Sequence, residues 1–177
     1  MQTYLELQVP IRNDAKWFKD LRTVFRDKNV KWQHGHYHIT IAFCDETPED
    51  VDLCPILEKH LGSSAPPELT FDCLNAFRTR SGTYVVHLGV TDIPDSFNSL
   101  VDAIRKDLSK AGCKILSDFK LHVTLGRIAD KTMGLATVQK LIKSIPMPCF
   151  TLKLSKYVFR EYENYNDDGV IYQKEII

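Results

Sequence analysis

Hydrophobic and polar residues alternate along several short stretches of the chain, and this two-residue period predicts β-strands. Residues 3–9 (TYLELQV) show it clearly. Other stretches are rich in the β-branched and aromatic residues that favour strands, namely 36–44, 68–77, 84–90, 120–128, 149–159 and 170–176.

A helical period of hydrophobic residues occurs in four further segments. Their apolar positions recur three or four residues apart: Trp17, Phe18, Leu21, Val24 and Phe25; Leu53, Ile56, Leu57 and Leu61; Phe97, Leu100, Val101, Ile104 and Leu108; Leu135, Val138, Leu141, Ile142 and Ile145. Before the second segment, Thr47 suits a helix N-cap and Pro48 the first helical position. We therefore expect that helix to begin near residue 48.

The predicted elements follow the order strand–helix–strand–helix–strand, and this order occurs twice, roughly in residues 1–80 and 81–177. Such a repeat predicts an α+β fold with two pseudo-symmetric lobes, whose mainly antiparallel sheets face a central groove with the helices outside. No linker of distinct composition separates the repeats. We therefore expect residues 1–177 to form a single bilobal domain.

Composition excludes several classes of protein. The chain has 177 residues, with 23 Lys and Arg balancing 23 Asp and Glu, whereas proteins that coat long nucleic acids are usually basic. It contains no apolar run of the roughly 20 residues that a membrane span needs, and its N-terminus lacks signal-peptide features. The five scattered cysteines include no CxxC pair. We expect a cytoplasmic monomer without disulfides, a membrane association or an obligate protein partner.

The middle strand of each repeat carries the same pattern, HITI at 38–41 and HVTL at 122–125. Residues two apart on a strand share a face, so His38 lies beside Thr40 and His122 beside Thr124. If the lobes are related by a two-fold axis, these faces meet across the groove. Two imidazoles can then act as acid and base on a phosphoester, while the hydroxyls bind its oxygens. This chemistry requires neither metal nor cofactor.

With these paired motifs the chain resembles the 2H phosphoesterases, and within them the RNA 2′,3′-cyclic phosphodiesterase or 2′-5′ RNA ligase group. The stretches KW (31–32), FKLHVTLGR (119–127) and the closing LKLSKYVFRE…GVIYQKE are also similar to that family. Leu121, Cys44 and Asp45 depart from its pattern. The resemblance implies hydrolysis of 2′,3′-cyclic phosphates at RNA ends or small nucleotides to 2′-phosphates, with reverse 2′-5′ ligation.

Further residues are candidates for substrate binding. Arg127 matches an arginine of the family and could neutralise phosphate, although strict alternation from His122 would place it on the opposite face unless the strand contains a bulge. Lys120 shares the face of His122 and is a second phosphate-binding candidate. Candidates for stacking on a base are Tyr37, Phe43, Phe119 and Tyr157.

Three alternatives remain open from the sequence. His34, His36 and His38 alternate and could form a zinc site, but this hypothesis leaves the second motif unexplained. The protein could instead cleave 2′-5′ oligonucleotides or other cyclic nucleotides. It could also bind RNA ends or nucleotides without turnover. The sequence does not distinguish which histidine is the acid and which is the base.

Overall fold

The computed structural model describes residues 1–116, 118–129, 132–164 and 166–177. Its helices are α1 (Lys16–Val24), α2 (Cys54–Leu61), α3 (Asp95–Lys110) and α4 (Leu135–Lys143), with a short 3-10 turn, η1 (Asp167–Gly169). Its strands are β1 (Thr3–Gln8), β2 (Val30–Trp32), β3 (His38–Glu46), β4 (Glu68–Phe71), β5 (Cys73–Arg78), β6 (Tyr84–Gly89), β7 (Lys114–Ile115), β8 (Val123–Ile128), β9 (Phe150–Lys153), β10 (Lys156–Glu161) and β11 (Val170–Glu175). Within these ranges, no helix is both long and apolar enough to cross a membrane.

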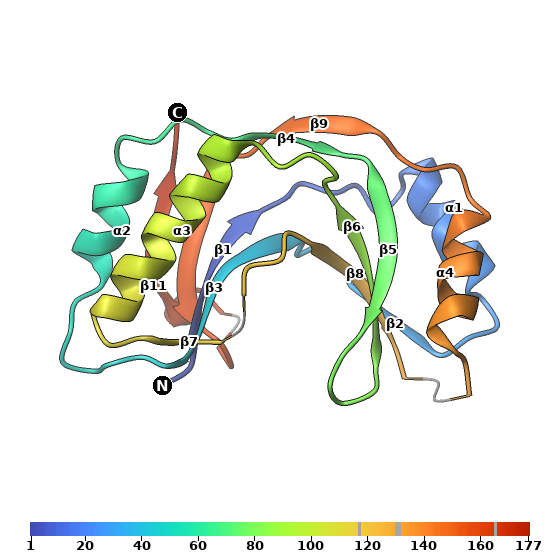
Figure 1. The fold of residues 1–177 in the computed structure, drawn as a ribbon, viewed down its shortest axis with the longest axis horizontal. Helices are drawn as coiled ribbons and strands as arrows, with labels where there is room; N and C mark the ends of the chain where they lie inside the picture. The colour runs from blue at the N-terminus through green and yellow to red at the C-terminus, as the bar shows by residue number, and fades with distance from the viewer. Residues whose placement is uncertain (117, 130–131, 165) are drawn as a thin grey trace.

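Nine of these strands form one sheet, which arches across the molecule in Figure 1. The main path runs β11-β10-β1-β3-β8-β6-β5, with β7 paired to β3 and β2 paired to β8. Figure 1 shows α2 and α3 outside one end of the arch, and α1 and α4 outside the other. All strand pairings in the described ranges are antiparallel. The predicted α+β fold, with its mainly antiparallel sheet and outer helices, is confirmed.

The middle of the sheet is the seam between β3 and β8, where Ile39 pairs with Val123. Each side of this seam contains strands from both sequence repeats. On one side β1 and β3 continue into β10 and β11, and on the other β8 and β6 continue into β5. The repeats therefore interleave within one sheet, and the seam brings their middle strands into contact.

Alternation along β3 decides which of its side chains face the helices. Ile39 and Ile41 have no exposed surface and belong to the hydrophobic core, together with Phe18 of α1. Complete burial of a side chain of this size contributes about 1.5–3 kcal/mol to folding. His38 and Thr40, on the other face, stay partly exposed. Core packing thus holds the first motif toward the open side of the sheet.

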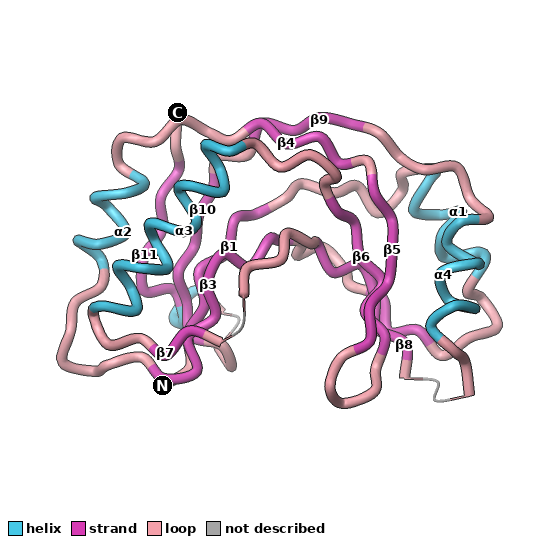
Figure 2. The backbone as a smooth tube through the Cα atoms, in the orientation of Figure 1, coloured by secondary structure: helices cyan, strands magenta, loops and turns pink. Residues whose placement is uncertain are grey.

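Two predicted strands are divided in the structure. The segment predicted at 68–77 forms β4 and β5, and the segment predicted at 149–159 forms β9 and β10. The separated strands β4 and β9 pair with each other in a two-stranded sheet, which Figure 2 shows above the main sheet. Both divisions occur where the chain leaves one sheet for the other, so a hydrophobic pattern alone does not reveal them.

The predicted start of the second helix is wrong, because α2 begins at Cys54. Thr47 does not cap a helix. Its hydroxyl oxygen lies 2.7 Å from that of Thr3, and both residues are buried. The threonine is therefore used to join the end of β3 to the beginning of β1.

Candidate active site

The two His-x-Thr motifs lie side by side at the seam of the sheet. Because Ile39 pairs with Val123 in antiparallel register, His38 stands opposite Thr124, and Thr40 stands opposite His122. The two histidines are diagonal neighbours, which places their backbones about 7–8 Å apart. All four side chains line one cavity of about 780 Å³. The expected meeting of two imidazoles and two hydroxyls thus arises within a continuous sheet.

The first motif strand contains a β-bulge directly after its threonine. Thr40 and Ala42 pair with consecutive residues of β1, so Ile41 is the extra residue. A bulge shifts the alternation of side chains by one position. Phe43 therefore turns to the same face as Thr40 and lines the cavity.

The second motif strand has a bulge at the equivalent place. Thr124 and Gly126 pair with consecutive residues of β6, so Leu125 is the extra residue. Arg127 is thereby turned into the cavity, although strict alternation would have placed it on the opposite face. The sequence indicated that Arg127 could bind phosphate only if this strand contained a bulge, and the structure contains that bulge.

Beside the first motif lies a fully buried carboxylate, Glu6 of β1. Its Oε2 is 3.4 Å from Nδ1 of His38 and accepts a hydrogen bond of 2.9 Å from Nε2 of His36. Its Oε1 accepts a hydrogen bond of 3.2 Å from Nε2 of Gln8. Burial raises the pKa of the Glu6 carboxyl, but the hydrogen bond from His36 and the charges of both histidines outweigh burial and lower it. Glu6 is therefore a permanent anion behind the first motif.

The second motif histidine has a different environment. Nδ1 of His122 lies 2.8 Å from the backbone carbonyl oxygen of Lys120, to which it donates a hydrogen bond. The ring stands edge-on to Phe77 and His87, with centroids 5.3 Å and 5.8 Å away. Burial lowers the pKa of His122, while the Lys120 carbonyl opposes this effect.

In both motif histidines Nδ1 is the ring nitrogen turned toward the protein, so we assign Nε2 to the cavity. Nδ1 of His38 is shielded from solvent beside Glu6, and Nδ1 of His122 is engaged by Lys120. Burial lowers the pKa of His38 to about 4, although the Glu6 carboxylate raises it. The imidazoles are thus predominantly neutral near pH 7. A bound phosphate anion favours the protonated form of a neighbouring imidazole, which provides an acid beside a neutral base.

Among the residues that the structure describes, three cationic side chains line the same cavity, namely Lys31, Arg127 and Arg160. Lys31 and Arg127 are paired in register on β2 and β8, whereas Arg160 comes from β10 on the other side of the seam. The remaining lining residues are Tyr4, Gln33, His36 and Tyr162, in addition to Phe43 and the two motifs. Cations on both sides of two imidazoles suit a phosphate-bearing ligand.

The structure places four of the other predicted residues away from this cavity. Tyr157 has no exposed surface, and Tyr37 is buried with its hydroxyl bonded to Asn13 and to the backbone oxygen of Gln33. Phe119 packs against Phe97 at 6.2 Å between ring centroids. Lys120 contributes its backbone carbonyl to His122 and is not a lining residue. We therefore retain Phe43 alone as a base-stacking candidate and Arg127 as the phosphate-binding one.

Sequence reasoning missed the residues that neighbouring strands contribute. Tyr4 and Glu6 of β1 stand beside His38, with 5.6 Å between the ring centroids of Tyr4 and His38. Arg160 and Tyr162 reach the cavity from β10 and the residue after it. The glutamate in TYLELQV could have indicated a functional residue, because it stands among apolar residues. The sequence does not show, however, that this strand lies beside the strand of His38.

Glu6, His36 and His38 are the group in the described ranges that could hold a metal ion, since one ligand atom from each lies within 4.8 Å of the others. His34 is not part of this group, so the three-histidine zinc site considered from the sequence does not form. Both carboxylate oxygens of Glu6 already accept hydrogen bonds from His36 and Gln8. A metal ion bound to all three side chains would replace the hydrogen bond between Glu6 and His36.

The fold is shared with solved structures of low sequence identity. E. coli LigT in complex with 3′-AMP superposes with a TM-score of 0.65 at 18% identity, covering 99% of this chain and 97% of that chain. TT0787 of Thermus thermophilus gives a TM-score of 0.62 at 14% identity, covering 99% and 98%. Usb1 of Kluyveromyces marxianus gives 0.60 at 11%, with the same coverage. An arched antiparallel sheet with two His-x-Thr motifs at its seam defines the 2H phosphoesterase class.

Within that class the chain belongs to the 2′-5′ RNA ligase superfamily, whose family model matches residues 10–164. A curated relative is the RNA 2′,3′-cyclic phosphodiesterase of Archaeoglobus fulgidus, which is 29% identical over 108 residues. This alignment spans 60% of each of the two proteins.

Proposed function

We propose that this protein is a metal-independent phosphodiesterase that opens 2′,3′-cyclic phosphates at RNA ends or on small nucleotides. The observation that carries the proposal is the placement of two imidazoles and two threonine hydroxyls, with three cations, around one cavity. The A. fulgidus relative bears the name of this activity. The products are a 2′-phosphate and a free 3′-hydroxyl. When the 5′-hydroxyl of a second RNA attacks phosphorus in place of water, the same opening of the ring joins the two RNA ends through a 2′-5′ bond.

The two Nε2 atoms supply the proton transfers. One neutral imidazole takes a proton from water as the water oxygen bonds to phosphorus. The bond from phosphorus to the 3′ oxygen breaks, and the other imidazole, protonated next to the phosphate, gives its proton to that oxygen. Thr40 and Thr124 hydroxyls and the Arg127 guanidinium stabilise the negative charge on the non-bridging oxygens.

The test measures turnover of a panel containing a 2′,3′-cyclic mononucleotide, an RNA ending in a cyclic phosphate and a 2′-5′ dinucleotide, with and without a chelator. We expect cyclic phosphates to yield 2′-phosphates, at a rate that the chelator does not change. Turnover of the 2′-5′ linkage alone would indicate the alternative phosphodiesterase activity. Tight binding of every substrate without turnover would indicate a binding protein.

Substitution of the motif histidines makes the first specific prediction. His38→Ala and His122→Ala should each lower kcat on a cyclic phosphate about 10²-fold or more, because each removes one partner of general acid–base catalysis. The double variant should lose far less than the product of the two losses, since the residues act as a unit. A single variant with near-normal kcat would contradict the two-histidine mechanism.

A further inference from the structure

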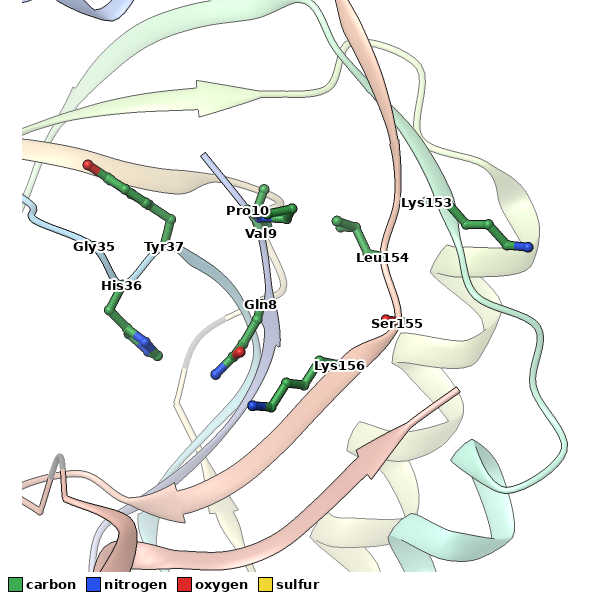
Figure 3. Close-up of a pocket in the computed structure, with 10 residues that line it drawn as sticks. All are labelled: Gln8, Val9, Pro10, Gly35, His36, Tyr37, Lys153, Leu154, Ser155 and Lys156. Carbon is green, nitrogen blue, oxygen red and sulfur yellow. The ribbon is translucent and has the colours of Figure 1, made fainter. Parts of the chain in front are cut away.

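A second cavity, of about 290 Å³, adjoins the active-site cavity. It lies where β1 ends and where the chain passes from β9 to β10, and residues 8–10, 35–37 and 153–156 line it (Figure 3). His36 lines both cavities. A ligand bound at the motif histidines could therefore extend directly into this second space.

The polar groups of this cavity converge on one side of it. Figure 3 shows the ends of the Lys156, Gln8 and His36 side chains pointing toward a common space, whereas Lys153 points away. Glu175 is paired with Lys156 in register on β11. Even so, Lys156 makes no ion pair within 4.0 Å among the residues that the structure describes. Its ammonium group is available to an anionic ligand.

The opposite side of the cavity is apolar. Val9, Pro10 and Leu154 contribute to its lining, and Val9 and Leu154 are themselves buried in the core. An apolar wall facing a cationic rim suits a molecule with a flat ring system and a phosphate, such as a nucleotide. Glu6 is fully buried and is not among the residues that line this cavity, and both its oxygens accept hydrogen bonds from His36 and Gln8, so no free carboxylate oxygen faces a bound anion.

The distance between the two cavities fits one nucleotide step. On one side of β1, Gln8 pairs with His38 of β3. On its other side, Leu7 pairs with Tyr157 of β10, and continuing this antiparallel register by one residue places Lys156 beside Gln8. His38 and Lys156 are thus separated by two inter-strand spacings, about 10 Å between their backbones. The long lysine side chain can reach a phosphodiester adjacent to the one held at the histidines.

We propose that the second cavity binds the penultimate nucleotide of an RNA 3′ end, with Lys156 holding the phosphodiester that links it to the terminal cyclic nucleotide. This inference rests on the proposed function and narrows its substrate to RNA ends of at least two nucleotides. Free cyclic mononucleotides fill only the active-site cavity. They should therefore be poorer substrates.

The experiment compares kcat/KM for adenosine 2′,3′-cyclic phosphate and for the adenylyl dinucleotide that ends in the same cyclic phosphate. The intact chain should prefer the dinucleotide about tenfold or more. Lys156→Met should reduce kcat/KM for the dinucleotide several-fold more than for the mononucleotide. It should also reduce the slope of log(1/KM) against log salt for the dinucleotide by about 0.7, the value for one lost phosphate contact on a single strand.

Lys153→Met is the matched control, because Lys153 borders the same cavity and carries the same charge but points away from it (Figure 3). It should leave the substrate preference and the salt slope unchanged. Equal kcat/KM for the two substrates in the intact chain, or equal losses on both in Lys156→Met, would overturn the inference while leaving the proposed function intact. Absence of turnover on both substrates would contradict the proposed function and this inference with it.

Discussion

Glu6 and His87 hold matching positions beside the two motifs but differ in chemistry. Glu6 pairs with Thr40 on β3, and His87 pairs with Thr124 on β8. One motif histidine therefore has an anion behind it, and the other has an imidazole whose pKa burial lowers to about 4. This difference makes two motifs with the same sequence pattern chemically unequal.

Glu6→Gln should shift one limb of the pH profile of kcat/KM to lower pH. The carboxylate raises the pKa of His38, so replacing it with a neutral amide of the same shape lowers that pKa further. The limb that moves identifies whether His38 serves as acid or base. The pH dependence of kcat/KM on a cyclic phosphate measures the effect, and a profile in which neither limb moves would show that Glu6 does not act on His38.

At the scale of residues, the sequence predicted what the two motifs contain and missed what surrounds them. His38, Thr40, His122 and Thr124 could be found because they recur within a repeated order of elements. Glu6 could not, because its role depends on β1 lying beside β3. Tyr157, a base-stacking candidate from the sequence, lies in the core for a related reason: its burial depends on packing among segments distant in the sequence.

The twin bulges are the elements that complete the cavity. Each comes immediately after a motif threonine and turns one further side chain, Phe43 or Arg127, into the cavity. Past the second bulge, Gly126 lies directly beneath Trp32 of β2. The close approach of β2 at this glycine keeps Lys31 next to Arg127.

Gly126→Ala should destabilise the protein by about 1–3 kcal/mol, the usual cost of forcing an extra methyl group into a packed site. The added Cβ would lie 2.7 Å from Cε3 of Trp32 and 3.1 Å from Cγ1 of Val30. Activity should also fall, because β2 and Arg127 must move. Urea unfolding measures the free energy change.

Gly134→Ala is the control, since a Cβ there would meet no atom of the described residues within 4 Å, its chain neighbours aside. Its free energy of unfolding should stay within about 0.5 kcal/mol of the original. Equal stability of the two variants would show that the contact between Gly126 and Trp32 does not restrict this strand.

At the scale of elements, periodicity predicted the helices and most strands but not the partners of the strands. Residues 68–77 and 149–159 each read as one strand, yet each is divided between the main sheet and the small sheet of β4 and β9. The strands β2 and β7 are too short to show an alternation of hydrophobic and polar residues. These features are set by long-range pairing, for which the local sequence carries no signal.

The molecule as a whole holds two half-buried histidines near its centre, and this couples its stability to pH. Burial lowers the pKa of both His38 and His87 to about 4, against about 6.5 in an unfolded chain. Between these values the unfolded chain binds protons that the folded protein does not. The contribution of these groups to stability is therefore complete above pH 6.5 and declines as the pH falls toward 4.

The free energy of unfolding should accordingly fall as the pH is lowered from 6.5 to 4. His87→Leu should reduce the slope in this window by up to about 1.4 kcal/mol per pH unit, the value for one proton. His34→Ala, which removes an exposed histidine, should leave the slope unchanged. Urea unfolding at several pH values checks this, and a slope that His87→Leu does not alter would contradict the burial of a neutral imidazole.

The seam at which Ile39 pairs with Val123 has a consequence for how this architecture diverges. The separation of the two imidazoles is set by the spacing of neighbouring backbones, which is the same whatever side chains form the core. Mutations elsewhere can therefore accumulate without changing the distance between acid and base. A chain sharing 18% of its residues with E. coli LigT can keep the same fold along 99% of its length. In such proteins the backbone pairing of the two motif strands is the feature that must be kept, and the sequence of the rest of the molecule can change more freely.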